Sequence, residues 1–409
     1  MPNFSIALTG LQADTVALDT IGNNLANLNT TAFKGQTTTF EDLFYQNVGT
    51  TGSGDRLQVG VGTRVNSTSS DFSQGSLTTT GDENDVAISG SGFFVVQQGN
   101  FQNLTRAGDF QVDSTGNLIT SSGESVMGYG VVGGAVDQSS GIKPITLPVG
   151  ATAAAQGTSY IQFQSTLDST AAVGTAFTSP VTVYDSLGAS HQVNVVFTKT
   201  SDSTWSYDAE LTAGTASGTP INNTGTLTFD ASGNLVSPAA NITGVTFPGM
   251  TDGAKDLTFS FNLYNSAGVG QITQTAGTSN TSTTTQDGYT AGAFQSYTVD
   301  GNGLISATYS NGKTQPIAQL AMASVTNTDG LVRSGANDYT VTAASGAMNI
   351  GLANVGGRGT IEGQALEQSN VDISAEFSDL IVAQRAFEAN SKTVTTFDSV
   401  TEQAINMIR

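Results

Sequence analysis

The two ends of the chain carry long helical stripes of apolar residues that nothing adjacent in the sequence can cover. Near the start, apolar residues recur at spacings of three, four and seven, which is typical of one helix face: Phe4, Leu8, Leu11, Leu18, Ile21, Leu25 and Leu28. Near the end a seven-residue repeat is sustained, at Ile373, Leu380, Phe387, Val394, Thr401 and Ile408. Such a heptad predicts a coiled-coil seam. Because one amphipathic helix cannot bury its own stripe, we expect the two ends to pair with each other or with other chains.

Between these ends the sequence is typical of β-structure. Short apolar runs bounded by glycine, such as 86–90 and 93–96, predict strands. A turn motif recurs three times, as Val112-Asp-Ser-Thr-Gly-Asn-Leu118, Phe229-Asp-Ala-Ser-Gly-Asn-Leu235 and Val299-Asp-Gly-Asn-Gly-Leu304. In each copy the aspartate can cap the turn and the glycine can take the left-handed position. Three residues are candidate N-caps for the C-terminal helix: Ser369, Asn370 and Asp372.

Composition shifts divide the β-rich middle. A small-residue stretch covers 150–157, and a polar low-complexity stretch covers 273–286. The predicted fold class is therefore mainly β with α-helical termini, comprising N- and C-terminal coiled-coil helices, a discontinuous β domain and an inserted outer β domain. The predicted boundaries are 1–28 and 368–409 for the helices, 29–70 and 356–367 for connecting segments, 71–147 and 287–355 for the discontinuous β domain, and 148–286 for the insertion.

Charge and targeting signals narrow the classes of partner. The chain has 33 acidic and 13 basic residues, for a net charge of −20. Nucleic acids and anionic membranes both need a basic footprint, so we expect no nucleic-acid partner. No apolar run approaches the ~18 residues of a membrane span, so we expect no membrane insertion. No Lys or Arg precedes Lys34 and no apolar h-region follows, which predicts the absence of a cleaved secretory signal.

Residues that could carry chemistry are few. Cysteine is absent, which excludes thiolate metal sites and Cys nucleophiles. The single histidine, His191, has no second His or Cys near it and is expected to be a surface or hairpin residue. The acidic group Asp82, Glu83 and Asp85 is expected to accept backbone N–H bonds, and Trp205 is expected in the core. The Asp turns fail the spacing of a calcium loop. We expect no catalytic residue, no cofactor and no metal.

An asparagine-rich segment follows the first stripe. It reads Gly22-Asn-Asn-Leu-Ala-Asn-Leu-Asn-Thr-Thr-Ala-Phe-Lys-Gly35. Asparagine competes for backbone hydrogen bonds and is unusual in a helix. Two interpretations stay open: a frayed helix end entering a loop, or asparagines that share a face across an interface and fix its register.

At this segment the chain resembles the axial proteins of the bacterial flagellum, a family of rod, hook and hook-associated proteins. The N-terminal likeness lies in Leu8-Thr-Gly-Leu11, Leu18-Asp-Thr-Ile-Gly-Asn-Asn-Leu-Ala-Asn27 and Asn29-Thr-Thr-Ala-Phe-Lys34, with departures at Thr9 and Ala32. Further likeness lies in Asp85-Val-Ala-Ile-Ser-Gly-Ser-Gly-Phe-Phe-Val-Val96, Thr105-Arg-Ala-Gly-Asp-Phe110, Val181-Thr-Val-Tyr-Asp-Ser-Leu-Gly188, Gly363-Gln-Ala-Leu-Glu-Gln-Ser-Asn-Val-Asp372 and Ala383-Gln-Arg-Ala-Phe-Glu-Ala-Asn390. The length and the insertion favour the hook branch.

The resemblance implies a non-enzymatic subunit of the hook that polymerises into a flexible, curved tube and transmits torque from rod to filament. It implies export through the flagellar type III apparatus, an extracellular place in the flagellum, and the rod, hook cap and hook-filament junction proteins as partners. The expected polymerisation residues are Leu8, Leu11, Leu18, Ile21, Asn23, Asn24, Leu25, Asn27, Phe33, Lys34, Phe377, Leu380, Gln384, Arg385, Phe387, Asn390, Val394 and Ile405. The alternatives are a distal rod or hook-associated protein, or a secreted β-rich adhesin or glycan-active enzyme.

Overall fold

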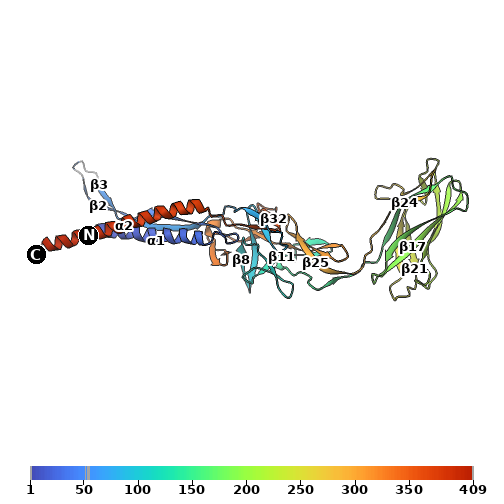
Figure 1. Ribbon diagram of the computed structural model, residues 1–409, viewed down its shortest axis with the longest axis horizontal. Coiled ribbons are helices and arrows are strands. Elements are labelled where there is room, and N and C mark those ends of the chain that lie inside the picture. Colours follow the sequence, from blue (N-terminus) through green and yellow to red (C-terminus); the bar gives the residue numbers. More distant parts are fainter. Residues whose placement is uncertain (1, 51, 53–55, 408–409) are drawn as a thin grey trace. The chain divides into compact units, whose positions relative to one another are not determined.

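The computed structural model describes residues 2–50, 52 and 56–407 and is mostly β, with a helix at each end (Figure 1). Helix α1 covers Pro2–Ala26 and helix α2 covers Ile373–Met407. The chain divides into two compact units, unit 1 (1–149, 296–307 and 314–409) and unit 2 (150–295 and 308–313). The predicted fold class is confirmed. Ile408 and the side chain of Phe4 lie outside the described residues.

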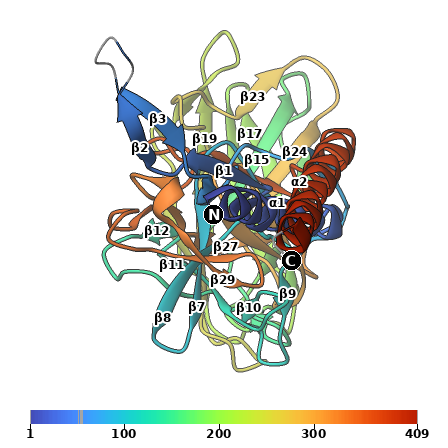
Figure 2. The same ribbon diagram turned by 90° about the vertical axis from the view of Figure 1, so that its left-hand side faces the viewer.

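Helices α1 and α2 lie side by side and run antiparallel in unit 1 (Figures 1 and 2). At one end of the pair, Asn24 Nδ2 donates to Glu376 Oε1 at 2.8 Å, and further along Asn390 Nδ2 donates to Asp14 Oδ2 at 2.8 Å. The helices approach closely at Gly10, where a Cβ would lie 2.8 Å from Asn390 Nδ2. At ~1.5 Å per residue, α1 is about 37 Å long and α2 about 52 Å, so α2 reaches past its partner.

The less exposed face of α2 follows the three-four spacing of a coiled coil, at Leu380, Ala383, Asn390, Val394 and Phe397. Of the predicted seam, Leu380 and Val394 lie on this face. Its other described members, Ile373, Phe387 and Thr401, are exposed. A straight helix drifts by ~20° per heptad relative to a seven-residue repeat, which moves the ends of such a seam off the contact.

The cap of α2 is Asp372, whose Oδ1 accepts the amides of Ser374 at 2.7 Å and Ala375 at 3.3 Å. Asn370, another of the three predicted caps, accepts the amide of Gly35 at 2.7 Å and not an amide of α2. After α1, strand β1 (Gln36–Asp42) pairs antiparallel with β4 (Thr63–Ser70).

A hairpin of β2 (Tyr45–Thr50) and β3 (Arg56–Gly60) connects β1 to β4, and the described residues of both strands are exposed.

The β part of unit 1 is assembled from two pieces of chain. Strand β11 (Ser125–Val132), before the insertion, pairs with β27 (Thr314–Leu320), after it. The sheet continues from β11 through β7 (Phe93–Gln98), β8 (Phe101–Thr105) and β30 (Asp338–Thr340) to β29 (Val332–Gly335). One core cluster of this unit contains Phe93, Val95, Leu104, Met127, Tyr129, Ala321, Ala323 and Tyr339.

Shorter elements complete this unit. Two short antiparallel pairs join the chain before the insertion to the chain after it, β5 (Leu77–Thr79) with β33 (Ala365–Glu367) and β6 (Val86–Ser89) with β32 (Thr360–Gly363). The bounds are β5 Leu77–Thr79, β6 Val86–Ser89, β9 Gln111–Val112, β10 Leu118–Ile119, β12 Ala135–Asp137, β13 Lys143–Pro144, β26 Leu304–Tyr309, β28 Met322–Ser324, 3₁₀ turn Thr328–Gly330, β31 Asn349–Gly351, β32 Thr360–Gly363 and β33 Ala365–Glu367.

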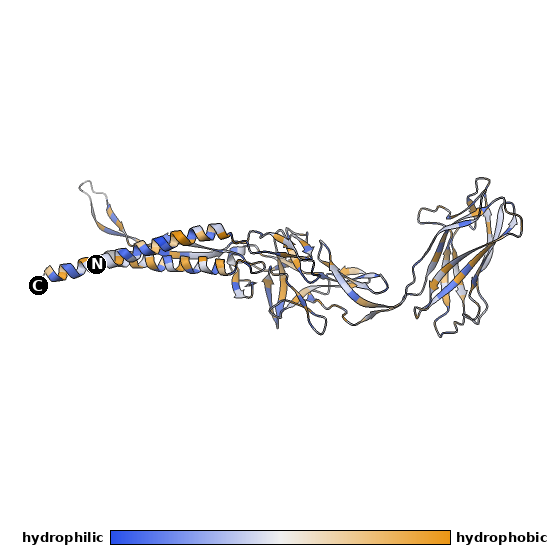
Figure 3. Ribbon diagram, viewed as in Figure 1, coloured by the Kyte–Doolittle hydropathy of each residue, from blue (hydrophilic) through white to orange (hydrophobic). Residues whose placement is uncertain are grey.

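Unit 2 packs two five-stranded sheets around one core. The first sheet has the antiparallel order β16-β17-β18-β19-β20, and the second has the order β21-β22-β15-β23 with β24 beside β15. Buried and less buried residues alternate along the long strands, so one face of each sheet supplies the core (Figure 3). Trp205 lies in this core with no exposed surface, as predicted.

The strand bounds in unit 2 are β14 Thr152–Ala153, β15 Tyr160–Asp168, β16 Ala176–Tyr184, β17 Ser190–Ser201, β18 Thr204–Leu211, β19 Thr224–Phe229, β20 Leu235–Ser237, β21 Ile242–Phe247, β22 Leu257–Asn262, β23 Ile272–Thr275, β24 Asn280–Gln286 and β25 Gly292–Val299. The first and last strands of this set, β14 and β25, pair antiparallel, with Ala153 opposite Gly292. The main stretch of unit 2, residues 150–295, therefore begins and ends in neighbouring strands, and β25 continues into unit 1.

The recurring aspartate turn is confirmed. Asp113 Oδ1 accepts the amides of Thr115 and Asn117, both at 2.8 Å. Asp230 and Asp300 accept the amides two and four residues on in the same way. The turn glycines have positive φ, namely 89° at Gly116, 80° at Gly233 and 77° at Gly303. The motif is thus a device for closing hairpins.

Candidate assembly surface and its anchorage

The helix pair presents apolar side chains that the monomer leaves uncovered. On α2, Ile373, Phe377 and Ile381 are spaced by four residues and therefore share one face. Their exposed fractions are 46%, 52% and 59%. We call these three residues the α2 stripe. Figure 3 shows apolar residues along both helices. Exposed apolar groups that line up on one face are typical of a protein–protein contact.

The expected polymerisation residues fall into three sets. Some are exposed on the helix pair: Leu8, Asn23, Phe377, Gln384, Arg385, Phe387 and Ile405. Others are partly buried: Leu11, Leu18, Ile21, Leu25, Asn27, Leu380, Asn390 and Val394. Asn24, Phe33 and Lys34 are buried inside the monomer. The contacts of these last three residues lie within one chain: Asn24 bonds to Gln36 and Glu376, Lys34 bonds to Glu367, and Phe33 packs under Arg333.

Lys34 lies in a buried ion cluster around Glu367. Lys34 Nζ is 2.6 Å from Glu367 Oε1, and Arg106 Nη1 is 3.1 Å from Glu367 Oε2. The side chains of Lys34 and Glu367 have no exposed surface, and that of Arg106 is 4% exposed. Burial lowers the pKa of Lys34, and the hydrogen bond to Glu367 opposes this shift. The single carboxylate therefore holds two desolvated cations in place.

Backbone groups complete the same cluster. Glu367 Oε1 also accepts the Gly75 amide at 2.9 Å, and Lys34 Nζ donates to the Ser73 carbonyl at 2.7 Å. Arg333 donates to the Lys34 carbonyl and stacks over the Phe33 ring, with its guanidinium carbon 4.9 Å from the ring centre. The motif that follows α1 is thus fixed to the β part of unit 1.

Two asparagines tie the helices to the strands. Asn24, 2% exposed, accepts the Gln36 amide at 2.9 Å and donates to the Gln36 carbonyl and to Glu376, each at 2.8 Å. Asn370 Nδ2 donates to the Asp71 carbonyl at 2.9 Å and to the Ser73 hydroxyl at 3.0 Å. Asn24 therefore bridges α1, β1 and α2 inside one chain, whereas Asn27 Nδ2 bonds back to the Asn23 carbonyl at 2.9 Å.

Sequence reasoning missed most of this cluster. Glu367, Arg106, Arg333 and Asn370 were not among the expected site residues. A signal was present, because a chain with only 13 basic residues places one of them, Arg106, directly after the buried half of strand β8. A charge flanked by core residues has to be paired or hydrogen-bonded, and its partner could have been sought.

Comparison with known proteins decides the family. The chain is 36% identical to flagellar hook protein FlgE of Salmonella typhimurium, over 99% of this chain and 100% of that protein. The chain belongs to the flagellar hook protein FlgE family. It is also 35% identical to FlgE of Escherichia coli and 32% identical to FlgE of Treponema pallidum, with 98–99% of each chain covered.

Four family models match parts of the chain. They describe a flagella basal body rod protein (4–34), the D1 domain of flagellar hook protein FlgE/F/G (87–161), the D2 domain of flagellar basal body protein FlaE (152–289) and the C-terminal part of flagellar basal body rod FlgEFG protein (362–407). The crystal structure of Helicobacter pylori flagellar hook protein FlgE2 shares the fold, with a TM-score of 0.52 and 15% identity over 71% of this chain and 100% of that chain. Within the described residues, neither helix is long and apolar enough to cross a membrane.

The remaining chemical candidates of this FlgE-family chain have structural roles. Asp82 Oδ1 accepts the Asn84 amide at 2.9 Å, and Glu83 Oε2 accepts the Tyr297 amide at 3.3 Å, as predicted for the acidic group. His191, predicted as a surface or hairpin residue, lies in the β16–β17 hairpin, where its side chain is 12% exposed and contacts two aspartates. Asp252 lies 61 positions after His191 in the sequence, so no local sequence pattern could predict that the two residues are in contact.

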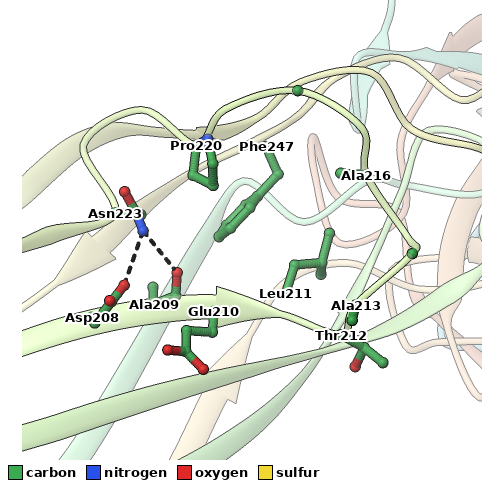
Figure 4. A pocket seen from close by; sticks show the side chains of 12 residues that line it. Asp208, Ala209, Glu210, Leu211, Thr212, Ala213, Ala216, Pro220, Asn223 and Phe247 are labelled. Atoms are coloured by element: carbon green, nitrogen blue, oxygen red, sulfur yellow. Dashed lines mark hydrogen bonds between the residues drawn. The ribbon is translucent and has the colours of Figure 1, made fainter.

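Unit 2 also carries a hollow of about 360 Å³ between β18 and the loop that follows it (Figure 4). Two carboxylates, Asp208 and Glu210, line it together with Phe247 and Pro220. Asn223 Nδ2 donates to Asp208 at 2.9 Å and to the Ala209 carbonyl at 3.3 Å. The carboxylate of Asp208 therefore binds the loop through Asn223. This arrangement does not favour the paired-carboxylate chemistry of a glycan-active enzyme.

A buried carboxyl pair makes the stability of unit 1 depend on pH. Asp338 and Glu124 are 5% and 3% exposed. Burial, reinforced by Glu124, raises the pKa of Asp338 from 3.8 to about 8. The folded state therefore keeps a proton that the unfolded chain releases. The stabilisation is complete below about pH 4 and is lost as pH rises through about 8.

Asp338→Asn should remove this pH dependence, because an amide needs no proton to stay neutral. We expect the variant to be more stable than the unmodified protein at pH 9 and to show a flatter profile between pH 4 and pH 9. Urea unfolding followed by circular dichroism at each pH measures it. Parallel profiles for the two proteins would contradict a raised pKa at Asp338.

Proposed function

We propose that this protein is a structural subunit of the bacterial flagellar hook that polymerises into a curved, flexible tube and transmits torque from rod to filament. The observation that carries the proposal is the α2 stripe, which the monomer leaves uncovered. The relatives of this chain in Salmonella typhimurium and Escherichia coli are named flagellar hook proteins, which supports the proposal. We assign no catalytic role to the chain.

In the assembled tube, helices of neighbouring copies would cover the α2 stripe. The α2 stripe of one copy would contact a different surface on the next copy. Such heterologous contacts can extend into an open helical polymer instead of closing into a ring. The expected polymerisation residues that are exposed, such as Leu8, Phe387 and Ile405, would lie in these contacts. The buried ones would act indirectly, by holding the helix pair to the β part of unit 1.

We further propose the domain roles that follow. The helices (1–28 and 368–409) would form the inner wall, joined by segments 29–70 and 356–367 to the discontinuous β domain (71–147 and 287–355). The inserted domain (148–286) would lie outermost. Rod, hook cap and hook-filament junction proteins would be the axial partners, and the flagellar type III apparatus would export the chain without a cleaved signal.

Removing residues 1–28 tests the proposal. The truncated chain should form no tubes, since α2 then lacks its partner helix, while the strands of both units remain folded. Electron microscopy after salting-out detects tubes, and circular dichroism detects the β-structure. The full-length chain, treated identically, is the control. Tubes formed by the truncated chain would refute an inner wall made of the terminal helices.

A further inference from the structure

The single histidine of the chain lies between two carboxylates in unit 2. His191 Nε2 is 2.6 Å from Asp185 Oδ2 and 3.5 Å from Asp252 Oδ2. Asp185 follows β16, His191 is the second residue of β17, and Asp252 lies in the loop between β21 and β22. The three potential ligand atoms all lie within 4.8 Å of one another. Two loops from different sheets thus converge on one imidazole.

The turn that holds Asp185 differs in one respect from the recurring turns at Asp113, Asp230 and Asp300. In all four turns Oδ1 accepts two amides, here those of Leu187 at 2.8 Å and Ala189 at 3.0 Å. In two others, Oδ2 is bound by the side chain of the asparagine four residues on, at 3.1 Å from Asn117 and 3.2 Å from Asn234. At Asp185, Oδ2 instead faces His191. The turn fold does not require this exchange, since the same hairpin closes with asparagine.

Asp252 is oriented in a similar way. Its Oδ1 accepts the Ala254 amide at 3.0 Å, which leaves Oδ2 directed at the imidazole. The 3.5 Å separation is longer than an ordinary N–H···O hydrogen bond. The Asp185 side chain is fully buried and that of Asp252 is 33% exposed, so the group is closed on one side and open to solvent on the other.

The local charge favours a cation. Two carboxylates face one imidazole in a protein of net charge −20. Between residues 144 and 312 the basic side chains are Lys199 and Lys255. Lys199 Nζ is already engaged by the carbonyls of Ser169 and Ala171. A divalent ion would offset the mutual repulsion of Asp185 and Asp252 more fully than a protonated imidazole can.

We propose that Asp185, His191 and Asp252 form a binding site for a divalent transition-metal ion, with Zn²⁺ as the best match. An imidazole nitrogen with carboxylate oxygens suits zinc, whereas calcium and magnesium take oxygen ligands. Tetrahedral zinc with bonds of about 2.0–2.1 Å separates its ligand atoms by roughly 3.3 Å. The Asp252 to His191 separation already matches, and the Asp185 to His191 contact has to open by roughly 0.7 Å.

The ion would replace the proton between Asp185 and His191, and water would take the fourth position. Because its ligands come from the β16–β17 turn and the β21–β22 loop, it would join the two sheets of unit 2 at their ends. Binding only the folded state, it should raise the melting temperature of unit 2. We expect a rise of roughly 5–10 °C at a free Zn²⁺ concentration one hundred times the dissociation constant.

The test uses the full-length monomer, free of any affinity tag, stripped with EDTA and titrated with Zn²⁺ in a calorimeter. The single histidine gives one imidazole signal in nuclear magnetic resonance, and it should shift on binding with one ion per chain. With no cysteine in the chain, no thiolate competes. The measurement is made on monomer and therefore does not depend on the proposed role in the hook.

Asp252→Asn is the decisive variant, because it keeps the buried contact between Asp185 and His191 and alters a partly exposed side chain. We expect its affinity for Zn²⁺ to fall at least tenfold. Asp230→Asn is the matched control, since it removes one charge from an aspartate turn of the same unit that lacks a histidine; its affinity should be unchanged. An unshifted imidazole signal, or equal affinities for Asp252→Asn and the unmodified chain, would overturn the site and leave a plain His–Asp contact.

Discussion

Replacing Glu367 with alanine should destabilise unit 1 by about 3–5 kcal/mol, which is the usual effect of removing one partner from a buried ion pair. The variant leaves the buried Lys34 and Arg106 close together without their shared carboxylate. It also strips the Gly75 amide of its acceptor. Since Lys34 and Glu367 lie close to α1 and α2 in the sequence, the helix pair should lose part of its attachment and keep the bonds of Asn24 and Asn370.

The chain provides an internal reference for this measurement. Its single tryptophan, Trp205, lies in the core of unit 2, so tryptophan fluorescence follows unit 2. Circular dichroism at 222 nm is dominated by the helices, which belong to unit 1. In urea, the dichroism transition of Glu367→Ala should move to lower concentration while the fluorescence transition stays in place.

Two further variants sharpen the result. Glu367→Gln keeps the shape of the side chain and removes its charge, so it should be intermediate. Glu41→Ala breaks the Glu41–Arg64 pair, whose side chains are 34% and 65% exposed. An exposed pair contributes at most about 1 kcal/mol, so this variant should be nearly neutral. Equal losses for Glu367→Ala and Glu41→Ala would show that the buried cluster does not anchor unit 1.

Serine at all three positions of the α2 stripe should abolish tube formation while leaving the monomer stable. Each side chain is about half exposed in the monomer. Burying the rest against a neighbour should contribute roughly 1 kcal/mol per residue, or about 3 kcal/mol per subunit. That difference corresponds to a critical concentration for assembly more than about 100-fold higher.

The triple variant is compared with serine at Val132 and Val173, which are 70% and 64% exposed and lie outside the helices. Sedimentation after salting-out measures the critical concentration, and thermal unfolding checks the monomer. We expect the control to assemble like the unmodified protein. If both variants lost assembly equally, general surface hydrophobicity, and not the stripe, would drive polymerisation.

The sequence indicated those features that arise from local patterns. The heptad in α2 predicted a helix that pairs along one face, and the Asp-x-x-Gly turns predicted hairpins closed by a side-chain cap. Both are confirmed because each depends on residues within seven positions of one another. Asn24 was singled out for the same reason, although its partners were not.

The partners in the buried ion cluster of Lys34, Arg106 and Glu367, which anchors the helices, could not be predicted from local sequence patterns. Lys34 and Glu367 meet across 333 positions of sequence, and Arg106 joins them from a third segment. Neither periodicity nor composition encodes which distant charges will share one desolvated site, because that depends on how the sheet brings the segments together. The contact between His191 and Asp252 eluded prediction for the same physical reason.

The pairing of β14 with β25 has a consequence for how such chains can change in length. Ala153 and Gly292 face each other across an antiparallel ladder, so their Cα atoms are separated by about 5 Å. A turn of a few residues could join them, and everything in between could be shortened, enlarged or exchanged without redirecting the rest of the chain. The stretch between Ala153 and Gly292, which is most of unit 2, is therefore a module that evolution or an engineer can exchange while the helices and their anchoring cluster stay as they are.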